Sequence, residues 1–176
     1  QIALRLLVHF VGDIHQPLHT SARVTDAEPK GDQGGNLFLL TPEGTKREDQ
    51  LNLHWYWDSI TGRNVPIKGD ECGRKYVEKI AQQMMNKYPF AIYQSELKLW
   101  NFESWQKESF PYNNTVVFSP DLKRFEMPST KYKKNAFKVA EKQLALAGYR
   151  LGEMLNETFG KPSVNPTATG LNFLNK

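Results

Sequence analysis

Residues 9–20 read HFVGDIHQPLHT and contain three of the four histidines of the chain. His9 and Asp13 are four residues apart, so on an α-helix they share one face about 6 Å apart along the axis. Pro17 ends that helix, and His19 lies just beyond the break, where the backbone can turn its ring back. The stretch therefore predicts a chelating pair at the end of a helix, with a further imidazole beside it.

The segment NLHWYWDS, residues 52–59, repeats the same spacing with His54 and Asp58. Zinc accepts imidazole nitrogen together with carboxylate oxygen, whereas structural zinc sites favour thiolates, and the chain has one cysteine, Cys72. Burying both pairs without a cation would cost several kcal/mol for each unpaired group. The two pairs therefore predict a shared metal site.

Two alternatives compete with that metal site. A histidine on an apolar helix is often a core residue bonded to a carbonyl, and an i,i+4 His and Asp can form a simple ion pair. His15 lies two residues from Asp13 and faces away from the His9 side. We therefore expect His15 to be structural, or to support the ligands from behind.

The bulk composition indicates one globular domain covering residues 1–176, with 39% apolar and 24% charged residues. No segment is apolar over the length that a membrane span needs. The net charge of +4 suits a polyanionic partner such as nucleic acid, but also serves solubility alone. Glycosylation sequons at Asn113 and Asn156 favour a secreted, lumenal or cell-surface glycoprotein. Gln1 begins what looks like the middle of a helix, so we expect the later part of a longer polypeptide.

The periodicity predicts a mainly α fold with a long loop or small hairpin around residues 20–50, in which residues 37–40 form a short strand. The last helix has the clearest signal, an apolar stripe that recurs at three- and four-residue steps, and we expect this stripe to be purely structural. Residues 111–130 are expected to be irregular. The expected helices cover residues 2–14, 51–60, 72–87, 90–107 and about 25 residues around the stripe Phe137, Ala140, Leu144, Ala147, Leu151 and Leu155.

The motifs VHFVGDIHQPLH, GDQGGN and NLHWYWDS resemble those of the zinc-dependent single-strand-specific nucleases of fungi and plants and the related protist 3′-nucleotidase/nucleases. Bacterial zinc phospholipases C are similar in fold and zinc arrangement. The late segment AEKQLALAGYRLGEMLN resembles the C-terminal helix of the family. The resemblance implies an all-α helical bundle of the phospholipase C/nuclease type with three zinc ions, of which this chain is the C-terminal portion.

The resemblance assigns zinc ligands position by position. His9 and Asp13 match ligands of a first zinc, and Asp13 also matches a ligand of the third. His19, His54 and Asp58 match the three protein ligands of the second zinc. Asp13 is also the residue placed to orient the attacking water, which makes it the catalytic candidate.

Weaker assignments concern the substrate and the surroundings of the metals. Asn36 and Asp32 belong to the segment that matches the GGN motif near the site, where Asn36 is a candidate substrate contact and Asp32 a supporting residue. Ser59 matches a position close to the bound phosphate or base. Trp55 and its two aromatic neighbours either stack on unpaired bases or belong to the core.

The chain departs from the family pattern in two ways. The interval from His19 to His54 is longer than in the fungal enzymes. The family's amino-terminal Trp, a nearby His, and an upstream Asp and His that complete the metal sites all precede the segment that matches Gln1. The resemblance thus implies a partner, the amino-terminal segment of the same polypeptide, without which an inactive fragment with an incomplete metal site is expected.

The activity that the resemblance implies is hydrolysis of single-stranded DNA or RNA, and of 3′-nucleotides, to products with a 5′-phosphate. A water held by the zinc pair would attack phosphorus in line. The alternative within the same superfamily is a zinc-dependent phospholipase C. The basic charge and the GGN segment favour the nuclease.

Overall fold

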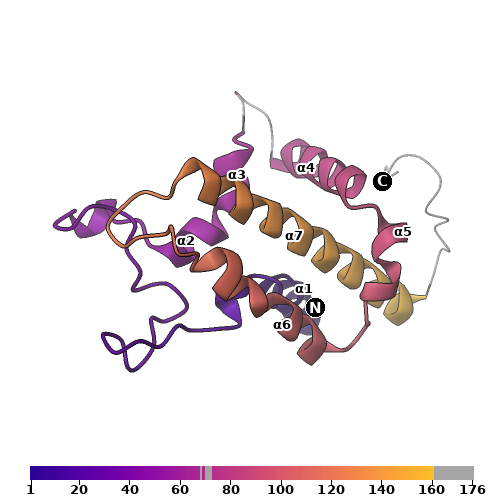
Figure 1. Ribbon diagram of the computed structural model, residues 1–176. Helices are drawn as coiled ribbons and strands as arrows, with labels where there is room; N and C mark the ends of the chain where they lie inside the picture. Colours follow the sequence, from indigo (N-terminus) through magenta and orange to yellow (C-terminus); the bar gives the residue numbers. More distant parts are fainter. Residues whose placement is uncertain (68, 70–72, 161–176) are drawn as a thin grey trace.

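The computed structural model describes residues 1–67, 69 and 73–160, and these residues form helices gathered around one long central helix, α7 (Figure 1). Helices α1, α3 and α4 pack directly on α7. The expectation of a mainly α fold is confirmed. The elements are α1 (Ile2–Asp13), the 3₁₀ turns η1 (Pro17–His19) and η2 (Arg47–Asp49), α2 (Leu53–Asp58), α3 (Ile60–Asn64), α4 (Gly73–Lys87), α5 (Phe90–Tyr93), the 3₁₀ turn η3 (Gln94–Glu96), α6 (Phe102–Ser109), the π-turn η4 (Asn113–Val117) and α7 (Thr130–Phe159).

Helix boundaries follow from capping side chains. Asn52 Oδ1 accepts a hydrogen bond from the Trp55 amide at 2.7 Å and begins α2. Ser129 Oγ does the same for the Tyr132 amide at 3.1 Å and begins α7. Such caps satisfy amide groups that the first helical turn leaves without partners. No helix among the described residues is long and apolar enough to cross a membrane.

The core consists of two clusters that contact different ends of α7. The larger one joins the 37–60 region to η4 and the amino-terminal half of α7, through side chains that include Leu40, Leu53, Trp57 and Tyr132. The smaller one joins α1, α6 and α7. Because α1 and α2 each pack against α7, the two helices that carry the His-x-x-x-Asp pairs are held in one frame.

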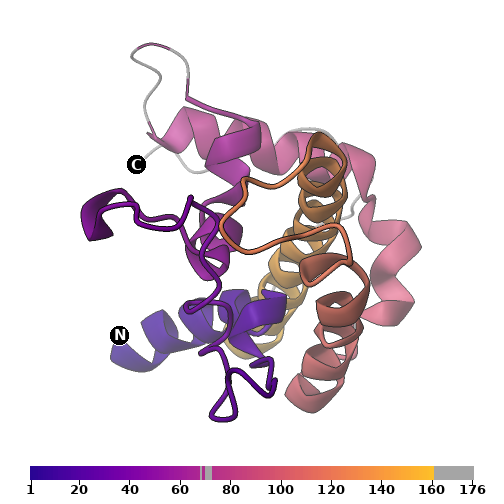
Figure 2. The ribbon, with the colours of Figure 1, turned by 60° about the vertical axis from the view of Figure 1, so that its left-hand side comes forward.

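The excursion over residues 20–50 projects from the bundle beside α1 and α2 (Figure 2). Inside it, buried Asp32 accepts a bond from the Arg23 amide at 2.9 Å, and Glu28 pairs with Arg124. Leu39 forms only an isolated antiparallel bridge with Asn52, so the expected strand at 37–40 was wrong. The bridge nevertheless fixes the excursion against the start of α2.

The expected helix over residues 90–107 is broken into α5, η3 and α6. Lys98 and Trp100 between η3 and α6 have φ angles of +43° and +62°, which an α-helix does not accommodate. The buried guanidinium of Arg150 donates from Nε to the Leu97 carbonyl at 2.9 Å, so a bond from α7 replaces one that a continuous helix would make. No proline or glycine marks this break in the sequence.

The expected helix over residues 51–60 is divided at Ser59 into α2 and α3, and α3 continues past Gly62. Ser59 has φ −95° and ψ 7°, and its Oγ donates to the Trp55 carbonyl at 2.6 Å. This bond competes with the helical backbone pattern.

For the expected helix over 72–87, α4 agrees from residue 73 onward, and Cys72 lies outside the described residues.

Helix α1 is apolar nearly all round in sequence, and in the described structure one side of it is buried. Leu7, Val11 and Ile14 pack into the small cluster with α6 and α7, because both helices lie on one side of α1. The other large apolar side chains of α1 are exposed among the described residues: Ile2, Leu4, Leu6, Val8 and Phe10.

The buried stripe of α7 is rotated relative to the expected one. Leu144 is 44% exposed, whereas its neighbour Gln143 is buried at 3% and Arg150 is fully buried. These two polar residues lie at helical spacing with the buried residues Ala136, Ala140, Ala147 and Met154. The stripe is therefore partly polar, and its polar members bond to the end of α1, as described below.

We predict that Tyr132→Phe destabilises the large cluster. Tyr132 Oη donates to the Val117 carbonyl at 2.9 Å and accepts from Trp57 Nε1 at 3.0 Å. Losing the hydroxyl leaves both buried partners without a bond, so the free energy of unfolding should fall by about 1–3 kcal/mol in urea titrations. Tyr112→Phe is the control, because the Tyr112 hydroxyl has no hydrogen-bond partner among the described residues. Equal effects would contradict the prediction.

Candidate metal centre

Three side chains from two separate segments meet at one point. His19 lies at the end of η1, and His54 and Asp58 lie one turn apart on α2. One potential ligand atom from each residue lies within 4.8 Å of the other two. His19 Nε2 is 3.0 Å from Asp58 Oδ1, and His54 Nε2 is 3.4 Å from Asp58 Oδ2. The carboxylate of Asp58 therefore lies between the two imidazoles.

Asp13 extends this cluster toward α1. Its Oδ1 lies 3.5 Å from His19 Nδ1 and its Oδ2 lies 3.1 Å from His9 Nε2. The five predicted ligands thus form a continuous series of imidazole and carboxylate contacts, in the order His9, Asp13, His19, Asp58 and His54. His9 is the outermost member and is not part of the three-residue group.

The cluster is open to solvent in the described structure. The side chains of Asp13 and Asp58 are each 39% exposed and that of His9 is 65% exposed, while His19 and His54 are 23% exposed. The expectation that both pairs are buried together was therefore wrong, and with it the argument from the cost of burying unpaired charges. The case for a metal rests on the spacing and identity of the donor atoms.

Two groups orient the ligands from outside the cluster. His54 Nδ1 donates to the Gly34 carbonyl at 2.8 Å, which leaves Nε2 as the ring nitrogen directed at Asp58. Gln16 Nε2 donates to Asp58 Oδ1 at 3.0 Å, and Gln16 Oε1 accepts from the Leu18 amide at 2.5 Å. We had not predicted the role of Gln16, although it lies in the motif between His15 and Pro17.

His15 is buried, and both of its ring nitrogens contact neighbouring groups. Its Nδ1 donates to the Val11 carbonyl at 2.6 Å, and its Nε2 lies 2.6 Å from Arg150 Nη1. Burial and the charge of Arg150 lower the pKa of His15 from its ordinary 6.5 to about 4. A neutral ring suits both contacts, because it donates at one nitrogen and accepts the guanidinium N–H at the other.

Polar side chains from α6, α7 and η4 also hold the backbone that connects His15 to His19. Gln143 Nε2 donates to the His15 carbonyl at 3.2 Å and to Ser109 Oγ at 2.8 Å. Asn113 Nδ2 donates to the Pro17 carbonyl at 3.2 Å. Asn113, the acceptor residue of one predicted sequon, is 5% exposed and thus buried in the folded structure. The turn that aims His19 is thus fixed by buried amides.

The structure places the predicted substrate and supporting residues around α2. Asn36 Oδ1 accepts a weak bond from Asn52 Nδ2 at 3.4 Å, beside the start of α2. The Ser59 hydroxyl is engaged with the Trp55 carbonyl and with Arg63 Nε, each at 2.6 Å. Asp32 is fully buried and contacts none of the five predicted ligands. Its bond from the Arg23 amide lies within the loop that carries Gly34.

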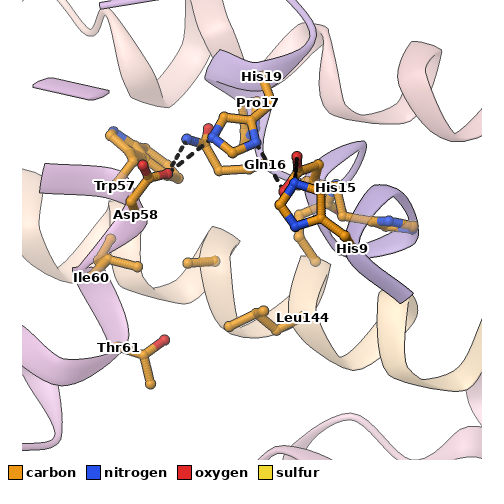
Figure 3. A pocket seen from close by; sticks show the side chains of 14 residues that line it. His9, His15, Gln16, Pro17, His19, Trp57, Asp58, Ile60, Thr61 and Leu144 are labelled. Carbon is orange, nitrogen blue, oxygen red and sulfur yellow. Dashed lines mark hydrogen bonds and ion pairs between the residues drawn. The ribbon is translucent and has the colours of Figure 1, made fainter. Parts of the chain in front are cut away.

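A cavity of about 400 Å³ lies beside the cluster, between α1, the α2–α3 segment and α7. Figure 3 shows His9 on one side of it and Asp58 on the other, with His19 between them. Apolar side chains, among them Trp57, Ile60 and Leu144, line its remaining walls. The cavity therefore joins a polar, metal-type donor set to a mainly apolar surface.

The donor set of His19, His54 and Asp58 fits zinc. Neighbouring ligand atoms around tetrahedral zinc are about 3.4 Å apart, close to the contacts of 3.0 Å and 3.4 Å that Asp58 makes with the two imidazoles. Three protein ligands leave a position open for water or substrate, as catalytic zinc sites require. His9 and Asp13 offer two donors, which are too few for a zinc site of their own.

Gly34→Ala should disturb the cluster through His54. Gly34 has φ +62°, and an added Cβ would lie 2.6 Å from the Leu18 carbonyl oxygen and 3.5 Å from His54 Nδ1. We expect a several-fold loss of zinc affinity in a competition titration, together with lower stability. Gly44→Ala is the matched control, because Gly44 has φ +82° with nothing within 4 Å of the added Cβ. Equal zinc affinity in the two variants would refute this role.

The lowered pKa of His15 has a defined consequence for stability. The unfolded chain takes up the proton near the ordinary pKa, whereas the folded protein resists it until about pH 4. The free energy of unfolding of the metal-free protein should therefore decrease as the pH falls from about 6.5 to about 4. His15→Asn should show a smaller decrease over this interval in urea titrations. A slope as steep as that of the unaltered protein would contradict the assignment.

Comparison with known proteins gives a consistent set of relatives. The family model for S1/P1 nuclease matches residues 1–160. The chain is 26% identical to Nuclease S1 of Aspergillus oryzae, with 92% of this chain and 55% of that protein covered. It is 29% identical to Endonuclease 5 of Arabidopsis thaliana, with 96% and 54% covered, and 27% identical to Nuclease P1 of Penicillium citrinum, with 90% and 58% covered. The chain thus spans about half the length of these relatives.

The family match covers all of the described residues, including both His-x-x-x-Asp pairs and the long helix α7. The chain belongs to the S1/P1 nuclease family.

Proposed function

We propose that the protein containing this chain is a zinc-dependent phosphodiesterase that hydrolyses single-stranded nucleic acids, and 3′-nucleotides as a further substrate class, to 5′-phosphate products. The observation that carries the proposal is the meeting of His19, His54 and Asp58 beside a cavity, in a chain of this family. The net charge of +4 favours a polyanionic substrate.

In this proposal His19, His54 and Asp58 hold one zinc ion. The Gly34 carbonyl fixes the tautomer of His54, and Gln16 holds the carboxylate of Asp58 in place. Such outer contacts make the ligands rigid, so less ordering is needed when the ion binds. Bound zinc would acidify a water molecule and neutralise charge that develops on the phosphate.

His9 and Asp13 contribute to the remaining zinc ions in the same proposal. Asp13 directs one oxygen toward His9 and the other toward His19, so it can link the His19 centre with its neighbours. Two donors do not complete a site, so the proposal requires further ligands from the rest of the protein. Asp13 is also proposed to accept a hydrogen bond from the attacking water and to orient it toward phosphorus.

The test is hydrolysis of single-stranded DNA by the protein before and after dialysis against a chelator. We expect chelation to abolish hydrolysis and added zinc to restore it. Asp58→Asn and His54→Ala should each lower the rate by more than about 100-fold, because each removes a proposed zinc ligand. Asp121→Asn is the control, since Asp121 is exposed and its carboxylate bonds to Ser119 in a surface turn.

Zinc content and a second substrate separate the competing interpretations. Elemental analysis should give three zinc ions in the complete protein and a loss in Asp58→Asn. No bound zinc, or full hydrolysis in the presence of chelator, would refute the proposal. Release of headgroup from phosphatidylcholine without hydrolysis of single-stranded DNA would instead identify a zinc phospholipase C.

A further inference from the structure

The three consecutive aromatic residues of α2 have different environments. Tyr56 and Trp57 are 3% and 2% exposed and belong to the large core cluster, so the expectation that the aromatic run is core is confirmed for them. Trp55 is 55% exposed. An exposed indole contributes little to folding, and its large apolar face remains available for a ligand.

Trp55 lies at the edge of the metal-ligand cluster. It follows His54 directly, and its amide is fixed by the cap from Asn52 at 2.7 Å. An α-helix turns about 100° per residue, so the Trp55 side chain leaves α2 roughly a quarter turn away from the face that carries His54 and Asp58. The indole therefore lies on the face of α2 that adjoins the ligand face, where a base of a strand bound at the cluster could contact it.

Arg63 completes a surface with Trp55. Its guanidinium carbon lies 5.0 Å from the centroid of the Trp55 ring and 5.6 Å from that of Tyr56. Arg63 Nε donates to Ser59 Oγ at 2.6 Å, and no carboxylate of a described residue forms an ion pair with Arg63. The guanidinium is thus held near the Trp55 and Tyr56 rings, with donors left for an anion.

We propose that Trp55 and Arg63 form a subsite for single-stranded nucleic acid, in which an unpaired base stacks on Trp55 and Arg63 contacts the adjoining phosphate. The inference rests on the proposed function and adds the residues that select unpaired strands. A paired base has its faces covered by its neighbours in the duplex, whereas a single strand can turn one face to the indole. Ser59 acts through Arg63, as a positioning residue rather than a direct substrate contact.

The first test compares a single-stranded oligonucleotide with an abasic strand of the same length, using binding anisotropy with hydrolysis-resistant phosphorothioate backbones and zinc-loaded protein. We expect Trp55→Ala to lower the ratio of the affinity for the intact strand to the affinity for the abasic strand about tenfold. Trp55→Phe should retain most of this ratio.

Trp100→Ala is the matched control for this comparison. Trp100 is also exposed, at 47%, and its Nε1 bonds to Glu157. Glu157 lies 13 residues along α7 from Leu144 in the cavity wall, a distance of about 20 Å. Trp100→Ala should therefore leave the ratio as it is.

The second test concerns Arg63. If it contacts a phosphate, Arg63→Ala should weaken binding and reduce the slope of log affinity against log salt by about 0.7, the value for one contact to a single strand. Arg74→Ala is the control, because Arg74 is exposed on α4 and already pairs with Glu78. An unchanged slope in Arg63→Ala would overturn the phosphate contact.

The outcomes separate this inference from the proposed function. Equal weakening of both strands by Trp55→Ala, or no weakening of either, in a protein that still hydrolyses single-stranded DNA would overturn the subsite alone. Failure of the unaltered zinc-loaded protein to hydrolyse or bind single-stranded DNA would overturn both proposals. A lower affinity ratio together with a smaller salt slope would support the subsite as described.

Discussion

The guanidinium of Arg150 joins three parts of the molecule at one buried point. It donates to the Leu97 carbonyl in the break before α6, pairs with Glu108 on α6 at 2.5 Å, and contacts His15 at the end of α1. A buried guanidinium is stable only when its donors are satisfied, so these segments must take their positions around α7 together. Helix α7 thereby fixes the end of α1, which carries Asp13, although α7 supplies none of the predicted ligands.

The position of His54 in the cluster depends on backbone hydrogen bonds between the 20–50 excursion and α2. The Leu40 amide donates to the Leu51 carbonyl at 2.8 Å, and the Leu53 amide donates to the Phe38 carbonyl at 2.9 Å. These bonds set the excursion alongside the start of α2. Gly34 then lies close enough for its carbonyl to accept the bond from His54. An irregular segment thus orients a ligand because its two ends are fixed.

How much the sequence could predict depended on whether the interaction was local. The two i,i+4 pairs follow from helical geometry, and the structure places them as that spacing predicts. The break after η3 depends on Arg150, which lies 53 residues from Leu97, and nothing in the local pattern marks it. A polar residue in a buried stripe, as at Gln143, was a visible signal, but its partners on α1 and α6 were not. The same limit explains the solvent exposure of the cluster, since burial depends on which elements meet.

The six residues of the short helix α2 include predicted metal ligands, core side chains and one exposed aromatic side chain. Because each residue is turned about 100° from the last, His54 and Asp58 share one face, Tyr56 and Trp57 turn into the core, and Trp55 is left at the surface. No position of α2 can change its face without moving the others. A shift of one residue would exchange a ligand for an aromatic side chain and expose the core. The spacing of ligands and aromatics in this segment therefore follows from one constraint, which is why a pattern of eight residues carries so much of the site.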